Sequence, residues 1–229
     1  MPSHFIDLSH PLDSQTQIYP SDPTFTMSPH ATHTPDGYSV HRLNLGTHTG
    51  THIDAPYHFV ASGATIESIT LSTFVGEPLI IDLSSTGLKK REKINWTHLS
   101  AYAPLIAKHC IVLINTGWSK AYYQTPTYLE HPYLSAEVAV ELLSLGVRLV
   151  GTDTLNPDET PAAGVAEGPD GFGFHEKFLG AGGIIAENLT NLEELLQVQQ
   201  EGGKWIVNLV PLRLVGADGS PVRAFACKV

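Results

Sequence analysis

The sequence predicts one domain of mixed α/β structure in which β-strands dominate, and three observations lead to that prediction. Apolar runs of strand length outnumber the segments with helical periodicity. These runs do not alternate regularly with helical segments, which argues against a doubly wound fold. The 16 prolines and 20 glycines are spread along the chain, as expected for many short elements with tight connections. The chain of 229 residues can bury one substantial core, so we expect a single domain over residues 1–229.

Eight segments are expected to form strands, because they are rich in apolar and β-branched residues and are bounded by turn residues. In chain order they are FIDLS near Phe5, Tyr38–Leu45, Pro78–Ser84, Cys110–Ile114, Val147–Val150, GIIAEN around Ile184, Lys204–Val215 and the closing PVRAFACKV.

One helix is clearly signalled, in the segment SAEVAVELLSLG. Ser135 is a favourable N-cap residue, Glu137 suits the first turn, and Gly146 can end the helix in a left-handed conformation. Shorter helices are expected after Asn95 and after Thr190.

Composition excludes several classes of function. The formal net charge of −10 makes the surface repel phosphate backbones, so nucleic acid is not an expected partner. The chain has no basic amphipathic segment and no apolar run near the roughly 18 residues of a membrane span. The opening MPSHFIDLSHPL has no signal-peptide pattern. Cys110 and Cys227 lie in apolar stretches and are expected to be buried thiols, which suits a cytoplasmic setting.

The stretch GTHTGTHIDAPYHF concentrates imidazole and carboxylate groups. His48, His52, Asp54 and His58 fall within eleven positions, with no Lys, Arg or Glu among them. All four numbers are even, so an extended chain would point the four side chains to one face. Glycines and a proline in the same stretch disfavour a helix, and Pro56 is expected to end strand pairing before His58. Imidazole and carboxylate are ligands of hydrolytic Zn and Mn sites, so we predict half of a metal site rather than a polar surface loop.

The remaining ligands are expected from a later part of the chain. His175 follows a long Gly-, Pro- and acid-rich stretch at 154–172, and a loop of that length is functional or mobile. Glu187 lies in an apolar strand, where a lone carboxylate is costly unless it is paired or bound to a metal. The alternatives are that His175 is a surface residue and that Glu187 pairs with Arg213 or Arg223.

At this point the sequence resembles a known family. HTGTHIDAPYHF resembles the HxGTHxDxPxHF signature of the metal-dependent cyclase family, which includes bacterial-type kynurenine formamidase and isatin hydrolase. The segments IDLSHPL with IYPSDP, INTGW, HPYLSAEVAVELLSLGVRLVGTDTLNPD, HEKFLGAGGIIAENLTNL and VPLRLVGADGSPVRAFA resemble further parts of that family, so the resemblance covers nearly the whole chain. It implies the family's swivelling β/β/α fold, assembled as a homodimer or homotetramer.

The resemblance also implies a set of metal ligands. It assigns His48, His52 and Asp54 to a divalent ion, with Zn expected and Mn as the alternative. In the formamidase branch a second ion shares Asp54 and adds His175, and Glu187 also coordinates. One or two ions are therefore expected.

The implied reaction is hydrolysis of an amide C–N bond in a small molecule, N-formyl-L-kynurenine giving L-kynurenine and formate. A divalent ion lowers the pKa of its bound water, so that hydroxide is available at neutral pH to attack the carbonyl. His58 matches the family's general acid/base and would move the protons. Tyr19 takes the place of an aromatic residue, often Trp, that contacts the substrate, and this difference leaves the exact substrate open.

Other functions stay open beside this one. One is hydrolysis of an isatin-type cyclic amide or a lactone, and another is a metal-dependent cyclase or dehydratase of secondary metabolism. A metal- or ligand-binding module without catalysis is the third. Four further histidines lie in N-terminal segments that could border the pocket: His10, His30, His33 and His41.

Overall fold

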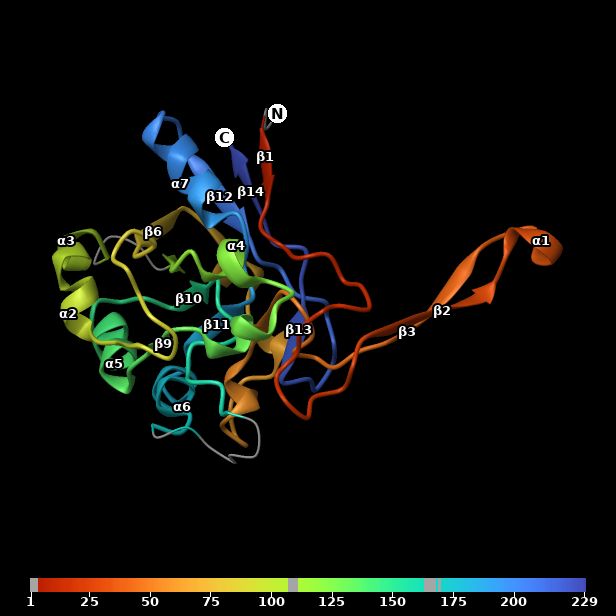
Figure 1. Cartoon of the computed structure of the whole chain (residues 1–229), viewed down its shortest axis with the longest axis horizontal. Helices are drawn as coiled ribbons and strands as arrows, with labels where there is room; N and C mark the ends of the chain where they lie inside the picture. The colour runs from red at the N-terminus through yellow and green to blue at the C-terminus, as the bar shows by residue number, and fades with distance from the viewer. Residues whose placement is uncertain (1–3, 107–110, 163–167, 169) are drawn as a thin grey trace.

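The body of the protein is built on a six-stranded sheet (Figure 1). The structure is a computed structural model that describes residues 4–106, 111–162, 168 and 170–229. Across the sheet the strands follow the order β13 (Gly219–Pro221), β4 (His52–Asp54), β11 (Ile184–Glu187), β10 (Leu149–Thr152), β8 (Ile111–Asn115) and β6 (Pro78–Asp82).

Four of these strands are parallel, and helices connect them. β6, β8, β10 and β11 run in the same direction, whereas β4 is antiparallel to both β11 and β13. The four parallel strands are almost continuously apolar because both faces of the sheet are covered. The connecting helices are α2 (Trp96–Leu99), α3 (Ala103–Ile106), α4 (Trp118–Tyr122), α5 (Ala136–Ser144) and α6 (Gly173–Gly180).

A second sheet packs on one face of the first. Its order is β1 (Phe5–Asp7), β14 (Phe225–Lys228), β12 (Trp205–Asn208) and β5 (Val75–Gly76), and neighbouring strands are antiparallel. Helix α7 (Leu192–Gln200) lies beside it. One apolar cluster joins the two sheets and α7, since it contains Trp205 and Val207 together with Ile53 and Leu113. The opposite face of the large sheet packs against α5 and α6 through a second cluster.

The remaining regular elements of the body are short. β7 (Lys93–Ile94) and β9 (Tyr133–Leu134) form a small parallel ladder. Single 3₁₀ turns occur at η1 (Pro56–His58), η2 (Ile66–Ser68), η3 (Leu71–Thr73), η4 (Ser100–Tyr102) and η5 (Pro126–Glu130).

One hairpin stands away from the body, and we call residues 26–44 the arm (Figure 1). It consists of β2 (Thr26–Ala31) and β3 (Val40–Asn44), with the short helix α1 (His33–Asp36) near its tip. Every residue of β3 is exposed, and so is every residue of β2 except Ala31. The exposed residues include large apolar ones: Met27, Tyr38, Val40 and Leu43.

The predicted fold class is confirmed, with differences in detail. The strand expected over 204–215 ends at Asn208, and Pro211, which has no N–H to donate, lies in the part that is not a strand. Ser135 does precede α5 in an extended conformation, but its side chain makes no capping hydrogen bond. Cys227 is buried as predicted, whereas Cys110 lies outside the described residues. In the part of the chain that the structure describes, none of the helices has the length and apolarity needed to span a membrane.

Candidate metal centre

Two neighbouring strands bring three predicted ligands together. His52 and Asp54 lie on one face of β4, and Ile53 between them points into the apolar cluster on the other face. Glu187 ends β11 directly opposite His52, and directly opposed residues of paired strands share a face. All three ionisable side chains are buried, with relative exposures of 5% or less.

Helix α6 adds His175 to this group, and Asp158 fixes its orientation. The Asp158 carboxylate accepts hydrogen bonds from the backbone N–H groups of Phe174 and His175 at 2.8 and 3.0 Å, so it also caps the start of α6. The Nδ1 atom of His175 donates to the same carboxylate at 2.6 Å. Its Nε2 atom is thereby left facing Asp54 Oδ2 at 3.4 Å and Glu187 Oε1 at 3.1 Å.

The ring of His52 is held in the same manner by the backbone. Its Nδ1 atom donates to the carbonyl of Gly50 at 2.8 Å. Its Nε2 atom lies 3.2 Å from oxygens of both Asp54 and Glu187. Metal-binding histidines usually have one nitrogen bonded to a carboxylate or carbonyl, which fixes the tautomer and directs the other nitrogen at the ion. His52 and His175 both follow this pattern.

The donor atoms of His52, Asp54, His175 and Glu187 converge but leave hydrogen-bonding capacity unused. We call these four residues the metal cradle. His52 Nε2, Asp54 Oδ2 and Glu187 Oε1 are buried and make no hydrogen bond, although neighbouring polar atoms lie 3.1–3.4 Å away. Ligand atoms of His52, Asp54 and Glu187 all lie within 4.8 Å of one another. Because buried polar atoms without partners are costly, their convergence fits a divalent cation. Imidazole and carboxylate donors suit Zn or Mn.

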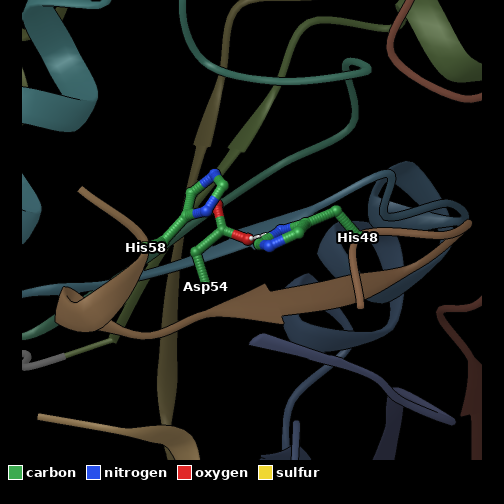
Figure 2. Close-up of side chains that lie close together, drawn as sticks. All are labelled: His48, Asp54 and His58. Carbon is green, nitrogen blue, oxygen red and sulfur yellow. Dashed lines mark hydrogen bonds and ion pairs between the residues drawn. The ribbon is translucent and has the colours of Figure 1, made fainter. Parts of the chain in front are cut away.

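His48 and His58 reach the cradle from outside β4. Their rings stack at 3.9 Å, and the carboxylate of Asp54 points toward both (Figure 2). His48 donates from Nδ1 to Asp54 Oδ1 at 2.7 Å and from Nε2 to Asp218 Oδ2 at 2.9 Å. His58 donates from Nδ1 to the same oxygen of Asp218 at 3.2 Å. One ligand atom each from His48, Asp54 and His58 also lies within 4.8 Å of the others, so Asp54 belongs to two groups with metal-binding geometry.

His48, His52, Asp54 and His58 therefore lie together, as predicted. The predicted cause, alternation along one strand, accounts for only two of them. Alternation along a strand explains His52 and Asp54 alone, because β4 contains just three residues. His48 arrives through a turn in which Gly50 has a φ of +66°, and His58 arrives through η1, which begins at Pro56.

β13 can bring Asp218 to this site because Gly219 follows it. Gly219 pairs with Asp54 across the sheet. A Cβ atom there would lie 2.7 Å from the carbonyl oxygen of Ile53 and 2.8 Å from Cε1 of His48. Only a residue without a side chain permits this approach.

Charges within the site strongly shift its pKa values. Burial lowers the pKa of His48, but Asp54 and the hydrogen bonds to Asp218 and Asp54 outweigh burial and raise it to about 9. For His52 burial is likewise outweighed, by Asp54 and Glu187, which raise the pKa to about 10. Burial would raise the pKa of Asp54, yet His48 and His52 hold it well below its usual range. In the metal-free protein, protons thus occupy positions that a cation would take.

The cradle opens into a cavity of about 480 Å³. One wall is aromatic and apolar, which is typical of a small-molecule site: Tyr19, Pro23, Phe59, Leu155 and Phe172. Tyr19, the predicted substrate-contacting residue, lies 6.0 Å from Phe172 between ring centroids. Phe59 stacks on the ring of His175 at 4.8 Å and forms part of the same wall.

Sequence reasoning missed two carboxylates, Asp158 and Asp218. Asp158 lies inside the acid-rich loop, and Asp218 lies in the C-terminal pattern VGADGSPVR, but no local spacing connects either with a histidine. The alternative partner for Glu187 is wrong, because Arg223 pairs with Asp7 while Glu187 faces the two cradle histidines.

None of the four N-terminal histidines lines the cavity or belongs to either group with metal-binding geometry in the described part of the chain. His10 is buried, stacks on Tyr123 at 3.5 Å and lies 2.9 Å from the hydroxyl of Ser119, and burial lowers its pKa to about 4. The other three, His30, His33 and His41, belong to the arm.

Comparison with known proteins agrees with this geometry. The Cyclase family model, described as "Putative cyclase", matches residues 6–159, more than half of the chain. The chain belongs to the cyclase family. Kynurenine formamidase of Bacillus cytotoxicus is 31% identical to it over 226 residues, covering 97% of this chain and 96% of the relative. Kynurenine formamidase of Bacillus thuringiensis subsp. konkukian is 32% identical with the same coverage.

Solved structures of other cyclase-family proteins share the fold. Isatin hydrolase A from Labrenzia aggregata, bound to benzyl benzoate, superposes with a TM-score of 0.82 at 23% identity, covering 98% of this chain and 93% of that one. An isatin hydrolase bound to the product analogue thioisatinate gives a TM-score of 0.84 at 20% identity, covering 97% and 91%. These similarities confirm the expected sheet-rich α/β fold.

Proposed function

We propose that this cyclase-family protein is a metal-dependent hydrolase of aryl formamides that converts N-formyl-L-kynurenine to L-kynurenine and formate. The observation that carries the proposal is the set of converging, unpaired buried donor atoms of the metal cradle at one end of an aromatic-walled cavity. The similarity to kynurenine formamidases at about 30% identity over nearly the whole chain supports the choice of substrate.

The proposed ligands are the cradle residues and His48. A Zn or Mn ion held there supplies Lewis acidity, which makes water acidic near neutral pH and polarises a carbonyl. Asp158 and the carbonyl of Gly50 hold the Nδ1 atoms of His175 and His52, so the Nε2 atoms would be free to bind the ion. Both ring nitrogens of His48 bond to carboxylates, so it would have to give up one of these contacts to hold the ion.

His58 is the proposed acid and base. Its Nδ1 atom is held by Asp218, so Nε2 is the nitrogen available to the reacting groups. The side chain is 28% exposed and lines the cavity. Nε2 accepts a proton from the attacking water. As the C–N bond breaks, it returns a proton to the leaving aryl nitrogen, so that formate and the amine are released.

The aromatic wall is proposed to bind the aryl part of the substrate. Tyr19, Phe59 and Phe172 line the cavity together. Their rings offer apolar contact to a benzoyl group and exclude water from the formamide carbon.

The test is metal content and N-formylkynurenine hydrolysis on one preparation, before and after chelation. Loss of activity with chelator and its return with Zn or Mn would support the proposal. Bound metal with hydrolysis of isatin but not of formamides would favour the second candidate, a cyclic-amide hydrolase, which the fold similarity to isatin hydrolases makes worth testing. A protein that binds neither metal would contradict both.

A further inference from the structure

One carboxylate in the cavity has no role in the metal centre. Asp22 lines the cavity together with Tyr19, and both belong to the turn IYPSDP. The turn is fixed by the backbone, because the N–H of Asp22 donates to the carbonyl of Tyr19 at 3.1 Å and Ser21 has a φ of +82°. The Asp22 side chain is therefore placed on the cavity wall without taking part in the turn's hydrogen bond.

The other carboxylates that line the cavity belong to the metal centre or bond to its histidines. Glu187 faces the cradle histidines, and Asp218 accepts hydrogen bonds from His48 and His58. The carboxylate of Asp22 has no hydrogen bond or ion pair with any residue in the described part of the chain. Burial raises its pKa, and the opposing charges of His48, His52 and His58 do not outweigh burial.

Within the described chain, the only basic side chains on the cavity walls are the histidines of the metal site. None of the described residues that line the cavity is Lys or Arg. A carboxylate on the substrate would find no Lys or Arg among these wall residues, whereas an ammonium group would find Asp22.

We propose that Asp22 binds a cationic amine of the substrate and so selects aryl formamides whose side chain carries a primary ammonium group. This inference rests on the proposed function. Because the cavity recognises the amine and not the carboxylate, a formylated aryl ketone that has the amine alone is also a substrate. The ammonium donates hydrogen bonds to the carboxylate, and such charge-assisted bonds are the strong ones.

The test compares three probes on the zinc-loaded protein: N-formyl-L-kynurenine, its analogue with hydrogen in place of the α-amino group, and N-formylkynuramine, which has the amine but no carboxylate. We expect kcat/KM to be about 10- to 100-fold higher for the two amines than for the deaminated analogue. Asp22→Asn should abolish that preference. Asp36→Asn, which makes the same charge change on the arm, should keep it.

A binding measurement separates this inference from the proposed function. Kynuramine, which needs no turnover, should bind the zinc-loaded protein at least about tenfold more weakly after Asp22→Asn. If no formamide is hydrolysed but this weakening is found, the proposed function fails and the role of Asp22 stands. Equal kynuramine binding by both proteins, or an equal loss of activity on all three formamides, would overturn the role of Asp22.

Discussion

The metal cradle and the arm are both built on antiparallel strands, yet they stand at opposite extremes of burial. β4 lies between β11 and β13, and each of its three residues is buried. β2 and β3 pair only with each other, and β3 is exposed along its whole length. Each cradle side chain is positioned by neighbours from several elements, whereas the arm is held by its own ladder. An isolated two-stranded hairpin is only marginally stable in water.

This difference predicts which property a substitution changes in each region. A change in the cradle removes a ligand or the group that orients it, so its effect appears in metal binding and chemistry. A change in the arm alters a surface that touches little else, so its effect on the stability of the body is expected to be small.

The largest effect is expected from Asp54→Ala. Asp54 belongs to both groups with metal-binding geometry, so its substitution removes a candidate ligand from each of them. We expect loss of bound Zn, measured by elemental analysis, and hydrolysis below detection. Full activity with normal metal content in this variant would refute the proposed site.

The next effect is expected from His58→Ala, which removes the proposed acid/base but leaves the cradle intact. Metal content should stay normal while turnover falls by roughly 10²–10⁴-fold. Steady-state kinetics and elemental analysis on the same sample provide the check. Parallel loss of metal would make His58 a ligand rather than the acid/base.

Asp158→Asn tests the support of the cradle. The amide oxygen can replace only one of the two accepting carboxylate oxygens, and the negative charge beside His175 is lost. Losing a partner of a metal-binding histidine typically weakens metal affinity by about 10- to 100-fold. Competition with a chelating dye measures this change, and Asp170→Asn, on a carboxylate that pairs with Lys93 instead, is the matched control.

Metal affinity should rise with pH, because the ion competes with protons on the histidines of the site. The pKa values of His48 and His52 in the metal-free protein are about 9 and about 10. Because these exceed an unfolded value of about 6.5, both histidines stabilise the metal-free fold at low pH, and the contribution is lost as the pH rises through the folded values. Zn must displace their protons, so its affinity should rise about tenfold per pH unit for each proton released below pH 9. Calorimetry in buffers of different ionisation enthalpy counts those protons, and a pH-independent affinity would contradict the prediction.

The smallest effect is expected from Leu43→Ser on the arm. The side chain is 56% exposed, and the unfolding free energy should change by no more than about 0.5 kcal/mol. Urea titration at two protein concentrations measures it. A larger loss that depends on concentration would mean that a second copy covers the arm, in line with the homodimer that the family resemblance implies.

The sequence predicted the strands and the cradle residues better than it predicted how they meet. Short apolar runs such as that of β8 identify strands because burial on both faces leaves a pattern in the residues themselves. His175 and Glu187 are each unusual for their sequence context: one is a histidine after a long loop, and the other is a carboxylate in an apolar strand. The local sequence gives no comparable signal for Asp158 or Asp218. Their partners depend on sheet order and helix placement, which bring together residues far apart in the chain.

The position of Asp218 has a consequence for the order of events during synthesis. This residue bonds His48 and His58 from the position just before β13, 170 and 160 positions further along the chain. A growing chain can carry His52, Asp54, His175 and Glu187 long before Asp218 and the edge strand beside β4 exist. The ligands are thus made early and the site is completed late, after the segment that carries Asp218 and β13 has left the ribosome.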